Sequence, residues 1–255
     1  MKRVKILSAN VLADFLSPKN HPWAKRKGKC IKNLLSINPD IICLQELSKY
    51  QYQDLKTKLS LYQILDNNLQ HNSHPMNAIL YKKNLFEEEE SLILNLPNSI
   101  GNENIKRRIP RYANYVKLKN LSNNCFLNII NTHLSYDCSK LSILQVDIIL
   151  NFIKNHNILE NIIFTGDMNN TYNSSTMIKI FDYGFKDTYK FIHEENYKNP
   201  TFHSFRDNFN RDSKIDWILV KNLSGDVIDA NVLDYRPASE YGSDHFFVAA
   251  EFLFK

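Results

Sequence analysis

Glycine and proline are scarce in this sequence. Its 255 residues include six glycines and eight prolines, and nowhere do these gather with serine into a linker. Repeats at the periods of solenoids or propellers are also absent. Because layered β-rich folds reach this length as one domain, we expect residues 1–255 to form a single domain.

Long apolar runs are lacking as well, since no stretch approaches the roughly 18 residues of a membrane-spanning helix. Met1–Lys5 carries the positive charge of a signal peptide, but Asn10 and Asp14 interrupt the apolar run that follows. No small-residue cleavage site comes after it. We therefore expect a strand at this end of the chain and no membrane partner.

Cysteine is infrequent and scattered. The four cysteines, Cys30, Cys43, Cys125 and Cys138, form no C-x-x-C pair, and Cys43 and Cys125 lie inside apolar runs. This pattern argues against a zinc site and against a disulfide framework. We expect a reducing compartment, the cytoplasm.

Neither sign of charge dominates. Lysine and arginine number 32 and aspartate and glutamate 27, which gives a net charge of +5. That excess is compatible with a polyanionic partner but does not require one. Apolar residues make up 43% and aromatic residues 12%, enough for a sizeable core, so disorder and coiled coil are excluded. The acidic run Glu87–Glu90 is expected on a solvated face or turn.

Short apolar runs rich in Ile, Val and Phe have the length of strands. They are Val4–Ala9, Ile41–Leu44, Asn77–Tyr81, Ser91–Leu96, Ala113–Leu118, Cys125–Asn131, Asn161–Thr165, Ile215–Val220, Val227–Leu233 and Phe246–Phe254. Helical spacing predicts one helix between Pro22 and Pro39, a second capped by Ser139, and a third after Asn173. Many strands with few helices indicate two packed sheets flanked by helices.

Polar side chains follow several apolar strands at their carboxyl ends. Along each strand, successive side chains point alternately to the two faces of the sheet. Continuing this alternation places Asn10 on the face of Val4, Ile6 and Ser8, Glu46 on the face of Ile42 and Leu44, and His133 on the face of Leu127, Ile129 and Asn131. Asp167 and Asn169, two residues apart, are expected to face the same way.

Two further strands carry their polar residues at the amino end. Asp216 opens one, and Asp244 and His245 precede the other. If these strands run antiparallel to the others, all the polar groups meet at one rim of the molecule. Such a gathering of carboxylate and amide oxygens suits Mg²⁺ or Mn²⁺ and a metal-assisted attack on a phosphate ester. A glycosidase with paired carboxylates remains the alternative from chemistry alone.

The ordered motifs resemble the endonuclease/exonuclease/phosphatase superfamily of metal-dependent phosphoesterases. They are SANVLAD with Asn10, CLQEL with Glu46, NTHL with His133, GDMNN with Asp167 and Asn169, KIDWILV with Asp216, and GSDHFFV with Asp244 and His245. The resemblance implies an α/β fold, a four-layer sandwich of two mostly antiparallel sheets packed face to face with helices outside. The amino-terminal third, including Trp23 and Arg26, is similar to the nocturnin and poly(A)-deadenylase branch.

The resemblance also implies roles for these residues. Glu46, with Asn10 and Asp244, would bind Mg²⁺, which Mn²⁺ is expected to replace. Asp167 would activate or orient the attacking water, and Asn169 would hold that water or the scissile phosphate. His245, oriented by Asp216, would contact the phosphate, and His133 would stabilise charge in the transition state.

Substrate contacts are the remaining predictions. Arg111 is a candidate phosphate clamp, with a surface arginine beside Lys106–Arg108 as the other interpretation. Phe202 and Phe205 either stack on bases or belong to the core. We expect a monomeric nuclease acting on single-stranded RNA from the 3′ end, with RNA preferred over DNA. A phosphatase or phosphodiesterase on a small phosphorylated molecule, a DNA endonuclease and an inactive binding module are the alternatives.

Overall fold

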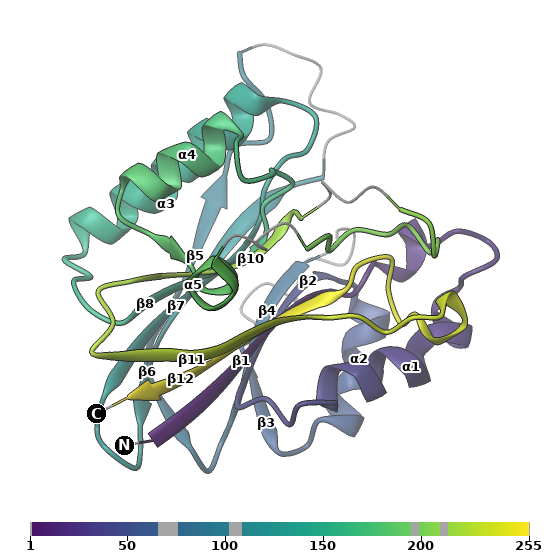
Figure 1. The fold of residues 1–255 in the computed structure, drawn as a ribbon, viewed down its shortest axis with the longest axis horizontal. Coiled ribbons are helices and arrows are strands. Elements are labelled where there is room, and N and C mark those ends of the chain that lie inside the picture. The colour runs from purple at the N-terminus through teal and green to yellow at the C-terminus, as the bar shows by residue number, and fades with distance from the viewer. Residues whose placement is uncertain (1, 66–75, 102–108, 195–198, 210–213, 255) are drawn as a thin grey trace.

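Two six-stranded sheets pack face to face in the computed structural model, which describes residues 2–65, 76–101, 109–194, 199–209 and 214–254 (Figure 1). The first sheet has the order β11 (Gly225–Leu233), β12 (Phe247–Phe254), β1 (Lys2–Asn10), β2 (Ile41–Leu47), β4 (Met76–Lys82), β3 (Tyr62–Leu65). The second has the order β5 (Phe86–Leu96), β6 (Arg111–Asn120), β7 (Phe126–His133), β8 (Ile162–Asp167), β10 (Asp216–Lys221), β9 (Lys186–Asp187).

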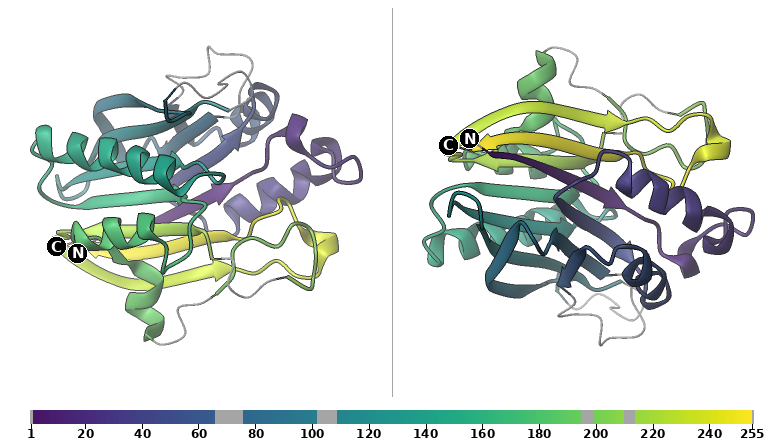
Figure 2. Two further views of the ribbon diagram at one scale, coloured as in Figure 1. Left: turned by 90° about the horizontal axis from the view of Figure 1, so that it is seen from above. Right: turned by 90° about the horizontal axis from the view of Figure 1, so that it is seen from below.

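Helices cover the outer faces of both sheets, so the predicted four-layer sandwich is confirmed (Figure 2). The helices are α1 (Trp23–Leu35), α2 (Lys49–Lys58), α3 (Ser139–Asn155), α4 (Ser175–Asp182) and α5 (Thr188–His193). The first sheet packs against α1 and α2, and the second packs against α3 and α4. Alternating residues face the core between the sheets, such as Ile6 and Cys43 of the first and Ile129 of the second.

The ten predicted strands and the long helices are present, with one shift of a cap, whereas β3 and β9 were not predicted. The residue that precedes α3 in an extended conformation is Cys138, so Ser139 is the first helical residue and not the cap. Helix α2 was not predicted, although Ser48 and Gln51 form a capping box at its start. The acidic run Glu87–Glu90 lies exposed in β5, as expected for a solvated face.

Strand direction settles where the polar ends of the strands meet. β1 runs parallel to β2, and β7 runs parallel to β8. β12 is antiparallel to β1, and β10 is antiparallel to β8. This is the condition under which the polar groups meet at one rim. The carboxyl ends of four strands therefore share one rim with the amino ends of β10 and β12. Among the residues that the structure describes, no helix is both long enough and apolar enough to cross a membrane.

Candidate active site

Asp167 lies at the centre of the polar cluster, at the end of β8. It is the register partner of His133 on β7 and of Asp216 on β10, so three predicted residues stand side by side across neighbouring strands. Gly166 makes this close pairing possible. It has a φ of +145°, and a Cβ built there would lie 1.9 Å from the Thr132 carbonyl oxygen. The glycine of the GDMNN motif is therefore required by the backbone.

Glu46 reaches the cluster by a different route. Ile42 and Leu44 pack in the core beneath α1 and α2, on the far side of the first sheet. The prediction that Glu46 shares their face is wrong, because its carboxylate accepts a hydrogen bond from Asn10 on the side between the sheets. A β-bulge interrupts the pairing of β2 with β4 between Leu44 and Leu47, and Glu46 adopts a φ of +56° within it.

Asn10 links the carboxylates of the two sheets. Its Nδ2 donates to Asp167 Oδ2 at 3.0 Å and to Glu46 Oε1 at 3.3 Å. The His133 ring lies between the same two acids, with Nε2 3.4 Å from Asp167 Oδ2 and Nδ1 3.8 Å from Glu46 Oε1. Ser243 donates its hydroxyl to the Asn10 carbonyl at 2.7 Å, which ties the loop before His245 to the end of β1.

The two histidines have opposite proton affinities. His245 Nδ1 lies 2.8 Å from Asp216 Oδ2. Burial alone would lower the pKa of His245, but the carboxylate of Asp216 outweighs it, and the pKa lies well above the usual range. Burial, together with the charge of Arg111 and His245, lowers the pKa of His133 well below the usual range. The surroundings therefore favour the cationic form of His245 and the neutral form of His133.

The acids of the site are crowded in a way that fits a bound cation. Burial and then the nearby Asp244 raise the pKa of Glu46. Burial and then Asp216 raise the pKa of Asp167 well above its usual range. Ligand atoms of Asp167, Asp216 and His245 lie within 4.8 Å of one another, and the buried Asp216 Oδ1 has no hydrogen-bond partner among the described residues. A cluster of several carboxylate oxygens suits a divalent metal ion.

Arg111 stands at the start of β6 with only 8% of its surface exposed. Burial lowers the pKa of its guanidinium, and the nearby carboxylates of Glu46 and Asp167 act against that. The interpretation as a surface arginine is therefore wrong, and its charge faces the acidic cluster. The neighbouring basic residues Lys106–Arg108 lie outside the described residues.

The remaining predicted residues lie on connecting segments. Asn169, with a φ of +50°, donates its backbone N–H to Asp167 Oδ1 at 2.9 Å and its side-chain amide to the Leu134 carbonyl at 2.9 Å. Phe202 forms a β-bridge with His245, and their ring centroids lie 5.0 Å apart. Phe205 stacks instead on His21, with centroids 4.0 Å apart.

Arg26 lies in the amino-terminal third that resembles the nocturnin and poly(A)-deadenylase branch, but it was not predicted as a site residue. Its guanidinium, on the buried face of α1, donates to the Val11 and Gly242 carbonyls at 2.6 and 3.0 Å and also to the Leu12 carbonyl. It thus ties the segment that follows Asn10 to the loop that precedes Asp244. The signal was present in the sequence, because Arg26 shares the helical spacing of the apolar residues Trp23 and Cys30.

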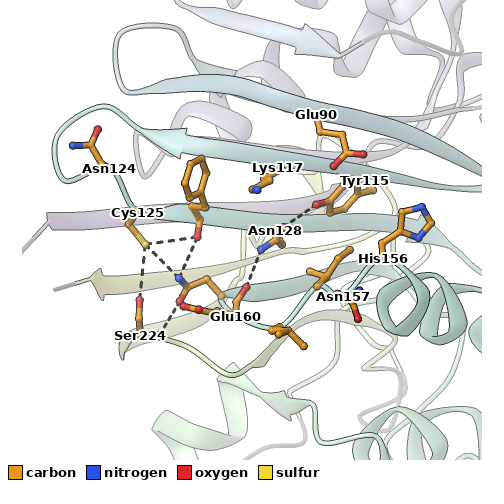
Figure 3. Close-up of a pocket in the computed structure, with 14 residues that line it drawn as sticks. Glu90, Tyr115, Lys117, Asn124, Cys125, Asn128, His156, Asn157, Glu160 and Ser224 are labelled. Carbon is orange, nitrogen blue, oxygen red and sulfur yellow. Dashed lines mark hydrogen bonds between the residues drawn. The ribbon is translucent and has the colours of Figure 1, made fainter.

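A separate cavity of about 730 Å³ lies at the other end of β7 (Figure 3). Its lining includes Asn128, whose amide donates to the Glu160 carbonyl at 2.8 Å and accepts from the Tyr115 hydroxyl at 2.8 Å. None of the predicted site residues lines it. The amino end of β7 is thus distinct from the polar cluster around His133.

Fold and site together define a phosphoester hydrolase built on a four-layer sandwich. A sequence profile of the Endonuclease/Exonuclease/phosphatase family matches residues 7–245, and the chain belongs to that family. Its members hydrolyse phosphoester bonds and generally use a divalent metal ion. A comparison with curated protein sequences gave no match.

Solved structures share the whole fold at low sequence identity. An endonuclease/exonuclease/phosphatase family protein from Bacteroides thetaiotaomicron is 23% identical with a TM-score of 0.83, over 100% of this chain and 98% of that one. The human nocturnin catalytic domain with bound sulfate is 22% identical with a TM-score of 0.77, over 99% and 95%. A mannosyl-6-phosphatase from B. thetaiotaomicron is 22% identical with a TM-score of 0.81, over 98% and 100%.

Proposed function

We propose that this protein is a Mg²⁺-dependent phosphodiesterase that shortens single-stranded RNA from its 3′ end. The observation that carries the proposal is the meeting of carboxylates, an amide and two histidines with opposite pKa shifts around Asp167. Those groups provide a base, a cation and ligands for a metal within one buried cluster. Metal-assisted hydrolysis of a phosphodiester uses all three.

Glu46, Asn10 and Asp244 are the proposed ligands of Mg²⁺. The fit rests on the chemistry of the donors, since oxygen ligands without thiolates suit Mg²⁺ or Mn²⁺. The raised pKa of Glu46 supports it, because a buried acid beside Asp244 is relieved by a cation. When bound, the metal supplies positive charge to the phosphoryl oxygens.

Asp167 is the proposed base that orients the attacking water and accepts its proton. A carboxylate whose pKa is raised toward neutrality removes a proton more effectively than an ordinary one. Asn169 fixes the direction of this carboxylate through the hydrogen bond from its backbone, and its side chain holds the water or phosphate. His245 is held by Asp216, and its ring Nε2, 3.8 Å from Asp167 Oδ2, is the proposed contact for the phosphate oxygens.

Two further residues are proposed to stabilise charge as it develops on the phosphate. His133 is neutral and donates one ring N–H, and Arg111 carries a fixed charge on a planar fork that fits two phosphate oxygens. Both are nearly buried, so water screens neither strongly. Preorganised donors of this kind contribute to the rate without reorganising during the reaction.

Single-stranded RNA is proposed as the substrate for three reasons. The net charge of +5 favours a polyanion. The half-buried ring of Phe202 lies beside His245, where a base next to the scissile phosphate would stack. The amino-terminal third resembles the nocturnin and poly(A)-deadenylase branch, and the whole fold is similar to that of nocturnin. Phe205 is a second proposed stacking residue, further along the same segment.

A phosphatase acting on a small phosphate ester is the second candidate. The similarity to a mannosyl-6-phosphatase, at the same identity as nocturnin, favours it. Both candidate activities would use the same catalytic residues. They differ in the group that carries the phosphate, which is an RNA chain in one and a small molecule in the other.

One experiment separates the candidates. The protein is incubated with labelled poly(A), mixed-sequence RNA, single- and double-stranded DNA and a panel of phosphate monoesters, with and without EDTA. We expect a ladder from the 3′ end of RNA that EDTA abolishes and added Mg²⁺ restores. Inorganic phosphate released from small molecules alone would support the phosphatase, and cleavage that resists EDTA would contradict the metal site.

A further inference from the structure

A buried amide spans the space between the two sheets directly beneath the site. Asn131 of β7 is fully buried, and its Nδ2 donates to the Leu44 carbonyl of β2 at 2.8 Å and to the Ala78 carbonyl of β4 at 3.1 Å. Leu44 and Ala78 are register partners across β2 and β4. One side chain of the second sheet thus binds both strands of a ladder in the first.

That pair is the last regular one before the bulge of β2. The next pair joins Leu47 to Met76, so β2 advances three residues where β4 advances two. Such a bulge inserts an extra residue and disrupts the local ladder. The amide of Asn131 supplies donors where the ladder breaks, and Glu46 lies inside the break at a φ of +56°.

Further buried polar groups hold Asn131 itself in place. Its Oδ1 accepts a hydrogen bond from Gln45 Nε2 at 2.7 Å, and Gln45 also donates to Ser8 Oγ at 3.1 Å. The Thr165 hydroxyl lies 3.5 Å from the same oxygen. Ser8, Asn131 and Thr165 each lie two residues before a predicted site residue of their own strand.

We propose that Asn131 is the positioning residue that holds the β2 bulge and thereby turns the Glu46 carboxylate into the metal site. Without its two donors, β2 relaxes toward regular pairing, and regular alternation would direct residue 46 to the helix side with Leu44. Asn131 also fixes Glu46 of the first sheet relative to Asp167 of the second. This inference rests on the proposed function, since it assigns Glu46 to a divalent cation.

The test measures Mn²⁺ binding to the full chain by calorimetry, without substrate. The variants are Asn131→Leu, which keeps a similar shape and removes the donors, Glu46→Gln, and the two combined. Asn128→Leu is the matched control, because it removes a buried amide from the opposite face of the same strand (Figure 3). If Asn131→Leu fails to fold, Asn131→Ser, which keeps one donor in place of two, replaces it in the same measurement.

We expect Asn131→Leu to weaken Mn²⁺ binding about ten-fold or more, as loss of a group that orients a ligand does. Asn128→Leu should lower the melting temperature but leave Mn²⁺ affinity within about two-fold. The double variant should bind no more weakly than Glu46→Gln alone, because Asn131 acts through Glu46.

Two results would overturn the proposal, for different reasons. Asn131→Leu binding Mn²⁺ like the wild type while Glu46→Gln binds weakly would remove the positioning role and leave the proposed function intact. A wild-type protein that binds no Mn²⁺ would contradict the proposed metal site itself.

Discussion

Strands β8 and β2 bring a carboxylate to the same cluster in different ways. β8 continues its regular pairing to its last residue, and alternation from Ile163 through Thr165 delivers Asp167. β2 breaks its pairing before Glu46, which turns to the side opposite from that of Leu44. Alternation is therefore a sound guide to a side chain only while the ladder that enforces it is intact.

Neutralising the carboxylate of the regular strand should have the largest effect. We expect Asp167→Asn to lower turnover about 10³-fold or more, because the base is lost while the shape is kept. Its melting temperature should not fall, since a crowded negative charge is removed. Activity on the best substrate and a thermal melt in EDTA check this, and near-normal turnover would contradict the role of Asp167.

Disturbing the close pairing that delivers Asp167 should have the next largest effect. We expect Gly166→Ala to lower the free energy of unfolding by about 3 kcal/mol or more, because its Cβ meets the Thr132 carbonyl. Gly28→Ala in α1 is the control, since a Cβ there meets nothing within 4 Å. That variant should gain about 0.5 to 1 kcal/mol from helix propensity. Equal stabilities in urea denaturation would contradict the account of β8.

The smallest effect concerns pH. The pKa of Glu46 and that of Asp167 are raised in the folded protein, chiefly by burial. Between the ordinary carboxyl pKa of about 4 and these raised values, the folded state binds more protons than the unfolded state. The stability of the metal-free protein therefore falls as pH rises through this window.

Asp167→Asn removes one of these titrations. In EDTA at pH 8 we expect it to exceed the wild type by about 1 to 2 kcal/mol in the free energy of unfolding. The difference should vanish as pH falls below about 3, where the carboxyl is protonated in both the folded and the unfolded state. Glu46→Gln should also have a higher free energy of unfolding than the wild type at pH 8. This variant tests whether the bulge places the Glu46 carboxylate in an equally crowded position. A difference independent of pH would contradict the crowding.

The sequence predicted most of the fold because its strands are short, apolar and regular. It also predicted that Asn10, His133 and Asp167 meet, since each follows an uninterrupted strand. The direction of Glu46 was not predictable, because a bulge depends on a partner strand and on Asn131 in the opposite sheet. The two-residue strand β9 is too short to carry a pattern.

The central claim is that Glu46, Asn10 and Asp244 of the first sheet hold one divalent cation beside Asp167 of the second. Crystals of the protein soaked with Mn²⁺ test it most directly through the anomalous scattering of that ion. We predict one strong peak in contact with the Glu46 carboxylate and within the cluster that includes Asn10, Asp167 and Asp244. A well-occupied peak elsewhere, with none beside Glu46, would contradict the account.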